Sequence, residues 1–235
     1  MQERNSDILL RFLHSLREKN LQQVHLFLLG DIFDLWVGGS SIFVKKFQPL
    51  VEALRDLKNA GARITYIEGN HDVHIESFWQ KKLGIDVFVE AQFYEINGLK
   101  VRVEHGDLIN LDDETYLRYR SIIRHPLVKP LNWIIPGKIW DEVGNYAARK
   151  SRARSHSYRV RNEEKLITMI RAHALRVFPE SPYDVLVSGH MHVYDDYEFQ
   201  VGAQKARSIN LGSWYGPTVK VLRLSGQKLD WVEIH

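Results

Sequence analysis

Five short motifs constrain this chain most strongly, because each places a polar side chain directly after an apolar run that reads as a buried strand. The central motif is His-Gly-Asp at 105–107. The others are Gly-Asp at 30–31, Gly-Asn-His-Asp at 69–72, Gly-His-Met-His at 189–192 and, more weakly, Asn-Leu-Gly-Ser-Trp at 210–214. Ligand sites of open α/β sheets gather at the carboxyl ends of strands. We therefore expect a site that is built from loops at such ends.

The order of the elements predicts a layered α/β sandwich. Helices are expected at 8–20, with Ser6 as the cap, and at 42–60, with Gly61 at its end. Strands are expected at 24–29 and 63–68, in a hairpin around Asn97-Gly98 within 87–103, and at 185–188, 194–200, 207–211, 219–224 and 229–234. Residues of about 113–178 form a helical insertion in a single domain of 1–235.

Composition narrows the cellular setting. There is no run of about 18 apolar residues, so no transmembrane helix is expected. The first residues lack the basic-then-apolar order of a signal peptide. The absence of cysteine excludes disulfides and thiolate metal sites, and a cytoplasmic location is the default expectation.

The motifs carry oxygen and imidazole groups, which Mn²⁺, Mg²⁺ and Fe²⁺ prefer as ligands. We expect Asp31 to bridge two ions, and Asn70, His105 and His190 to complete the shell of one of them. His192 would bind the second ion. Two such ions activate a bridging water for attack on phosphorus.

His71 suits a different task, since it follows the ligand Asn70. It could donate a proton to the leaving oxygen or hold a phosphate oxygen, and Asp72 would fix its tautomer. Each motif alone also has a structural explanation, as a turn or as a buried polar pair. Their joint occurrence, each after a strand, favours the metal site.

Four of the motifs resemble, in chain order, the signature of calcineurin-like metallophosphoesterases: Gly-Asp at 30–31, Gly-Asn-His-Asp at 69–72, His-Gly-Asp at 105–107 and Gly-His-Met-His at 189–192. This resemblance covers about residues 24–215. It implies a four-layered αββα fold, two bound divalent metals and hydrolysis of a phosphoester or a pyrophosphate. Manganese is the metal expected first, with magnesium or iron as alternatives.

Two longer blocks resemble the UDP-2,3-diacylglucosamine hydrolases of lipid A biosynthesis. They are FDLWVG at 33–38 and the stretch that runs from His105 to Pro126. The resemblance implies cleavage of UDP-2,3-diacylglucosamine to lipid X and UMP. It also implies that Asp113 contacts the sugar and that the helical insertion is a cap over the acyl chains.

The chain departs from this pattern at two places. The hydrolases have arginine at the position of His71, so the subgroup or the substrate could differ. The family also opens with a strand that ends in Asp-x-His, and nothing before Asp31 fits that motif. We expect that this first strand is omitted from the sequence rather than lost from the protein.

Residues 118–161 carry eleven Lys or Arg but only two acidic residues, with apolar residues between them. Such a segment can lie on an anionic bilayer or line a groove for acyl chains, so we expect peripheral contact with the inner membrane. Its aliphatic density argues against a nucleic acid as partner. The simpler alternative is a solvated helical face. Besides Asn70, His71 and Asp113, Arg120 and Arg124 are candidates for substrate binding.

Three functions remain open at this point. The first is a metal-dependent pyrophosphatase acting on a nucleotide-linked lipid. The second is a general phosphatase or phosphodiesterase acting on a soluble nucleotide, which His71 favours and the apolar insertion opposes. The third is a non-catalytic relative without the first metal motif.

Overall fold

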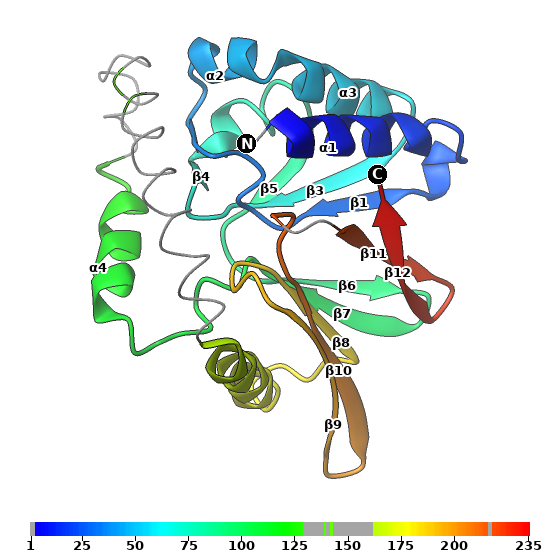
Figure 1. Cartoon of the computed structure of the whole chain (residues 1–235), viewed down its shortest axis with the longest axis vertical. Coiled ribbons are helices and arrows are strands. Elements are labelled where there is room, and N and C mark those ends of the chain that lie inside the picture. The colour runs from blue at the N-terminus through cyan, green and yellow to red at the C-terminus, as the bar shows by residue number, and fades with distance from the viewer. Residues whose placement is uncertain (1–2, 129–138, 140–141, 143–161, 216–217) are drawn as a thin grey trace. The chain divides into compact units, whose positions relative to one another are not determined.

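The computed structural model describes residues 3–128, 139, 142, 162–215 and 218–235 (Figure 1). The chain divides into two compact units. The first unit comprises Met1–Val89, Asp113–Arg152 and His235, and the second comprises Glu90–Asp112 and Ala153–Ile234. Each unit is described below by itself.

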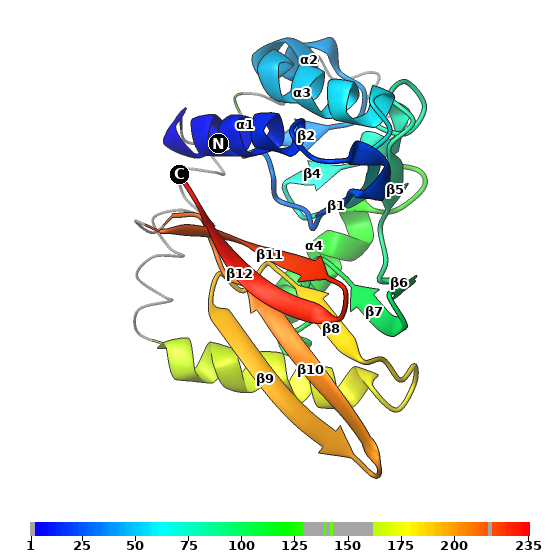
Figure 2. The same cartoon turned by 90° about the vertical axis from the view of Figure 1, so that its right-hand side faces the viewer.

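The first unit contains a parallel three-stranded sheet in the order β1-β3-β5. Its strands are β1 (His25–Leu28), β3 (Arg63–Ile67) and β5 (Asp86–Phe88), and its first helices are α1 (Glu3–Leu16), α2 (Ser41–Lys46) and α3 (Gln48–Asn59). Helices α1 and α3 lie side by side over one face of this sheet (Figures 1 and 2). Short elements complete the unit: η1 (Leu21–Gln23), η2 (Ile75–Ser77) and the parallel pair β2 (Trp36–Val37) and β4 (Asp72–Val73).

Two helices differ from the sequence prediction. Helix α1 buries Ile8, Leu9 and Leu13 as expected, but it already begins at Glu3, so Ser6 is not its cap. The single helix expected at 42–60 is two helices that meet at Phe47. Pro49 explains the break, because proline has no backbone N–H to donate and is tolerated in the first turn of a helix.

The FDLWVG block forms the aromatic core of the first unit. Phe33 and Trp36 are buried, with ring centroids 4.9 Å apart. Trp79 lies 5.1 Å from Trp36, and Phe47 lies 4.6 Å from Phe33. The indole N–H of Trp36 donates to the Gly38 carbonyl at 2.8 Å, which satisfies its polar atom inside the core. The block therefore fixes the backbone that follows Asp31.

The second unit contains a five-stranded sheet in the order β6-β7-β8-β10-β9. The strands are β6 (Gln92–Ile96), β7 (Leu99–Val103), β8 (Val185–Ser188), β9 (Tyr194–Val201) and β10 (Gln204–Leu211), and β11 (Val219–Ser225) and β12 (Lys228–Ile234) form a separate antiparallel pair. Strands β7, β8 and β10 are parallel neighbours. The expected hairpin at Asn97-Gly98 is confirmed, since both residues have a positive φ, as its tight turn requires.

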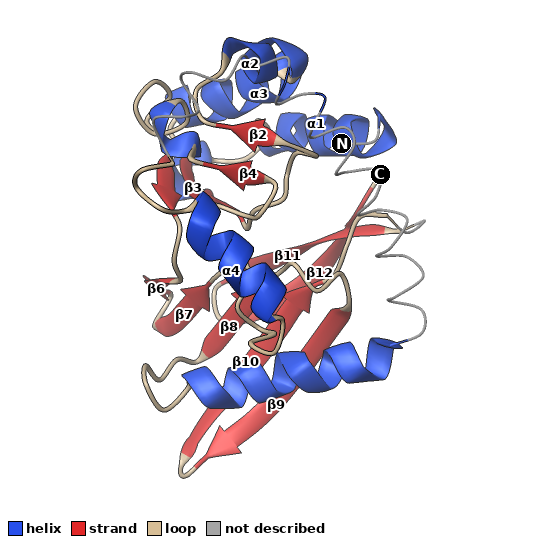
Figure 3. Ribbon diagram, turned by 90° about the vertical axis from the view of Figure 1, so that its left-hand side faces the viewer, coloured by secondary structure: helices blue, strands red, loops and turns tan. Residues whose placement is uncertain are grey.

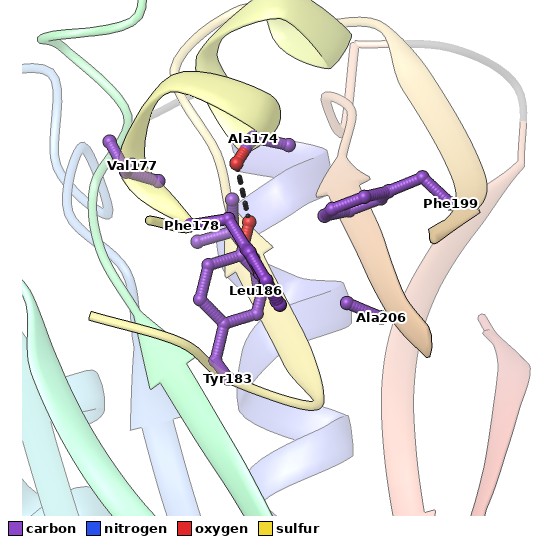
Figure 4. Close-up of a cluster of buried hydrophobic side chains, with 7 residues drawn as sticks. All are labelled: Ala174, Val177, Phe178, Tyr183, Leu186, Phe199 and Ala206. Carbon is purple, nitrogen blue, oxygen red and sulfur yellow. Dashed lines mark hydrogen bonds between the residues drawn. The ribbon is translucent and has the colours of Figure 1, made fainter. Parts of the chain in front are cut away.

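A helix at residues 162–177 covers one face of this sheet (Figure 3). Its C-terminal half packs into a buried cluster of helix and strand side chains (Figure 4): Ala174, Val177, Phe178, Tyr183, Leu186, Phe199 and Ala206. The Tyr183 hydroxyl donates to the Ala174 carbonyl at 2.9 Å and links the end of the helix to the segment that precedes β8.

The helical insertion expected at 113–178 is described mainly at its two ends. Helix α4 (Glu114–Ile123) belongs to the first unit, and the helix at 162–177 belongs to the second. Most of the basic and apolar segment at 118–161 lies outside the described residues. Each unit combines a sheet with helices, so the expected α/β class is confirmed. Among the described helices, none is long and apolar enough to cross a membrane.

Candidate active site

In the first unit, Asp31 follows β1 in a left-handed turn, with φ of 77° at Gly30 and 53° at Asp31. One carboxylate oxygen of Asp31 accepts hydrogen bonds from the backbone N–H groups of Asn70 and His71, both at 2.9 Å. The loop after β1 thereby holds the loop after β3. Two predicted site residues, Asp31 and Asn70, are brought together as expected.

Asp72 is the hub of these two loops and is completely buried. Its Oδ1 accepts from the backbone N–H groups of Asp31 at 3.0 Å and Gly69 at 2.7 Å. Its Oδ2 accepts from the N–H of Ile32 at 3.0 Å and from the Tyr66 hydroxyl at 2.5 Å. Such acceptance by an ionised carboxylate is among the stronger hydrogen bonds in proteins. Asp72 therefore sets the shape of the site.

Gly69 is required by close approach. A Cβ at this position would overlap the Asp31 carboxylate and would lie 2.7 Å from Oδ1 of Asp72. No side chain can be placed there without moving both carboxylates, which explains the glycine of this motif.

His71 points its Nδ1 at the backbone carbonyl of Asp34, 2.9 Å away. A carbonyl oxygen only accepts, so Nδ1 carries a proton and the partner that sets the tautomer is Asp34, where we expected Asp72. Burial lowers the pKa of His71, but the charge of Asp31, the bond to Asp34 and the charge of Asp72 raise it above its ordinary value overall. The ring is therefore stabilised in its protonated form.

Glu68 and Arg124 form a buried ion pair behind the same loop. Arg124 Nη1 lies 3.2 Å from Glu68 Oε2, and the side chains are 10% and 1% exposed. The other carboxylate oxygen of Glu68 accepts from the Ile75 N–H at 2.8 Å. Burial raises the pKa of Glu68 to about 7, against the opposing charge of Arg124.

The remaining predicted substrate residues lie on α4. Asp113 is its N-cap, and its side chain accepts from the Tyr116 N–H at 2.9 Å. Arg120 lies in the last turn of the helix. The sequence did not reveal the capping role of Asp113.

In the second unit, His105 and His190 come together at the ends of the parallel strands β7 and β8. His190 Nδ1 lies 3.1 Å from His105 Nε2, and the Gly189 N–H donates to the His105 carbonyl at 2.9 Å. Two imidazole nitrogens that bind one ion at about 2.1 Å each lie roughly 3 Å apart. The pair therefore has the spacing of two ligands of one metal, so the residues present fit the expected ion.

Three predicted metal ligands have a left-handed backbone conformation, which residues other than glycine rarely adopt. Among the described residues, φ is 53° at Asp31, 63° at His190 and 59° at His192. Conformations of this kind cost energy and concentrate at functional sites. The ring of His192 also meets the ring of Tyr215 edge-on, with centroids 5.7 Å apart.

The loop that carries His190 is held from β10. The Asn210 amide is completely buried and donates to the Gly189 carbonyl at 2.7 Å and to the Ser188 hydroxyl at 3.0 Å. The weaker motif at 210–214 thus supports the His190 loop. Gly106 approaches this loop closely, since a Cβ there would lie 2.9 Å from the Gly189 carbonyl oxygen.

Sequence reasoning missed a buried polar chain behind His105. Glu104 bonds to the His173 ring at 2.5 Å and accepts from Arg102 at 2.8 Å, while Arg176 lies 2.7 Å from the other nitrogen of His173. Burial raises the pKa of Glu104, but the bonds and charges of His173 and Arg102 hold it below its ordinary value overall.

A signal for these supports was present. Glu68 and Glu104 each follow a predicted strand and directly precede a ligand motif, where a buried carboxylate is costly unless it is paired. His173 lies on the apolar face of its helix, at helical spacing from Leu166 and Ile170. Their partners could not be read from the sequence.

The chain is similar to a known protein family and to named relatives over most of its length. Residues 2–194 match the family described as Calcineurin-like phosphoesterase. The chain is 29% identical over 215 residues to the UDP-2,3-diacylglucosamine hydrolase of Pseudomonas syringae, with 91% of this chain and 84% of that protein covered. It is also 29% identical over 204 residues to the protein of the same name from Photorhabdus laumondii, with 87% and 83% covered. The family match spans most of the chain, and the chain therefore belongs to the calcineurin-like phosphoesterases.

Proposed function

We propose that the chain hydrolyses the pyrophosphate of UDP-2,3-diacylglucosamine to give lipid X and UMP. As a calcineurin-like phosphoesterase it is a metal-dependent phosphohydrolase. The identity of the substrate is inferred from the match to relatives named UDP-2,3-diacylglucosamine hydrolase, which extends over about nine-tenths of this chain. The stretch at 105–126, which resembles these hydrolases in sequence, lies within that match.

Calcineurin-like phosphoesterases use a dinuclear divalent metal site. We propose manganese as the metal, with Asp31, Asn70, His105, His190 and His192 as the ligands of the two ions. When bound, the metal pair supplies an activated water and neutralises charge on the phosphate. The donor set of one carboxylate, one amide and three imidazoles fits such an ion.

His71 is proposed to hold a phosphate oxygen or to give a proton to the leaving oxygen. Because its Nδ1 is bonded to the Asp34 carbonyl, Nε2 is the atom left for the substrate. The raised pKa keeps a proton on the ring at higher pH than an isolated imidazole would allow. The role of Asp72 is to hold the loop through backbone N–H groups.

Helix α4 supports a lipid as the substrate. Its outer face and the turn that follows expose Tyr119, Ile122 and Leu127, at 47%, 66% and 77%. Exposed large apolar side chains suit contact with acyl chains or with a bilayer. Asp113 and Arg120, at the two ends of α4, are the proposed contacts to the sugar and a phosphate. We place this activity at the cytoplasmic surface of the inner membrane.

The test is ³¹P NMR of the purified chain with Mn²⁺ and UDP-2,3-diacylglucosamine in detergent micelles. We expect UMP and lipid X, and little turnover of UDP-glucose or of bis(p-nitrophenyl) phosphate. Equal turnover of the lipid and the soluble compounds would instead support a general phosphodiesterase, which the histidine at position 71 favours. No UMP from the metal-loaded protein would refute the proposed substrate.

A further inference from the structure

The side chain of Arg124 is only 10% exposed, whereas most arginine side chains in proteins lie at the surface. Arg124 ends α4, where its backbone N–H donates to the Arg120 carbonyl. Its guanidinium reaches across to the loop after β3. There it contacts the Glu68 carboxylate at 3.2 Å, the Gly69 carbonyl at 3.1 Å and, more weakly, the Glu68 carbonyl at 3.5 Å.

The two carbonyls belong to successive peptide groups whose N–H ends are also bound. The peptide between Gly69 and Asn70 is held at its oxygen by Arg124 and at its N–H by Asp31, at 2.9 Å. The preceding peptide is held at its oxygen by Arg124 and at its N–H by Asp72, at 2.7 Å. Rotation of either peptide would break a bond at each end.

This arrangement connects a cation to a metal ligand through one peptide. A guanidinium on the carbonyl polarises the peptide and strengthens the hydrogen bond that its N–H donates to Asp31. The same contact fixes the main chain of Asn70, and therefore the direction of its side chain. Glu68 closes the loop from the other side by accepting the Ile75 N–H at 2.8 Å.

We propose that Arg124 is a positioning residue for the metal ligands Asp31 and Asn70 and that it does not bind the substrate. It acts through the peptide groups on either side of Gly69. Lysine cannot replace it, because a single ammonium cannot reach a carboxylate and two carbonyls in one plane as a guanidinium fork does. This inference rests on the proposed function only where turnover is measured.

The test compares R124A and R124K with R118A. Arg118 is the matched control, since it lies on the same helix, is 80% exposed and pairs only with Glu114 at 3.3 Å among the contacts described. Mn²⁺ binding to the metal-free proteins is measured by titration calorimetry, and kcat and KM are measured with UDP-2,3-diacylglucosamine. Circular dichroism reports the fold of each variant.

We expect R124A and R124K to bind Mn²⁺ about 10- to 100-fold more weakly, as is typical when a partner behind a metal ligand is removed. Their kcat should fall while KM stays at the wild-type value, and R118A should match the wild type. If R124A does not fold, R124K decides. Unchanged Mn²⁺ affinity, with or without a raised KM, would overturn the proposal. If the wild type does not release UMP, the proposed function fails, and the Mn²⁺ titration still decides the role of Arg124.

Discussion

The two units hold their candidate ligands by different means. In the first unit, carboxylates of Asp31, Glu68 and Asp72 accept backbone N–H groups of the loops that follow β1 and β3. In the second unit, the loops after β7 and β8 are held by backbone bonds and by the neutral amide of Asn210. In the first unit buried carboxylates bind the backbone of the ligand loops directly, whereas the buried carboxylate of Glu104 in the second unit binds the side chains of His173 and Arg102. Changes of charge should therefore damage the first unit more.

The largest effect should come from D72N. An amide in place of the carboxylate directs an NH₂ at two donors, and each buried donor left without an acceptor costs about 1–3 kcal/mol, so we expect a loss of about 4 kcal/mol. Urea unfolding measures this loss, and Mn²⁺-dependent turnover should fall to background. D56N is the control, because the ion pairs described for Asp56, with Arg17 at 2.6 Å and with Arg55 at 3.8 Å, both lie at the surface. Equal stability of D72N and D56N would contradict the charged hub.

The corresponding change in the second unit is N210A. It removes the donor to the Gly189 carbonyl and to Ser188, and we expect a loss of about 2–3 kcal/mol in the free energy of unfolding. Urea unfolding of N210A beside S188A separates the two contacts, with the smaller loss expected for S188A. A loss in N210A that exceeds the loss in D72N would reverse the comparison between the units.

Two buried tyrosines allow a matched comparison of single hydroxyl groups. The Tyr66 hydroxyl donates to the Asp72 carboxylate, whereas the Tyr183 hydroxyl donates to the neutral carbonyl of Ala174. Hydrogen bonds to charged groups are stronger, so we expect about 2 kcal/mol for Y66F and about 1 kcal/mol for Y183F in thermal unfolding. Equal losses would mean that the charge of Asp72 adds nothing.

The smallest effect concerns acid stability. Burial, together with the nearby charge of Arg63, lowers the pKa of His25 to about 4. Between this value and the ordinary value of 6.5, the unfolded chain binds the proton and the folded chain does not, so stability falls as pH drops from 6.5 to 4. H25Q should show a shallower loss over this range in urea unfolding at several pH values. An identical dependence of stability on pH in both proteins would show that His25 does not contribute to the loss of stability in acid.

The strand ends were predictable, because an apolar run followed by glycine and a polar residue is a local pattern. This pattern placed His105 and His190 at the ends of neighbouring strands, where the structure has them. It also placed Asp31 and Asn70 in adjacent loops. The helix break at Phe47 could have been predicted from Pro49, but the apolar periodicity of 42–60 continues across the break and indicates one helix.

The supports of the site were not predictable, because they depend on partners far along the chain. The tautomer of His71 is set by a backbone carbonyl 37 residues away, and any residue type could supply that group. Arg124 and Glu68 are 56 residues apart, so composition alone could not separate this arginine from its neighbours in the basic segment. The burial of a carboxylate is a local signal, but the identity of its partner is a tertiary property.

The most direct test of the account measures Mn²⁺-dependent release of UMP by the wild type, N70A and H190A in one assay. The account predicts that the wild type releases UMP only with the metal. Each variant, one from each unit, should lose at least about 100-fold in rate, since each lacks a proposed ligand. Release of UMP without metal, or full activity in either variant, would contradict the proposed metal ligands.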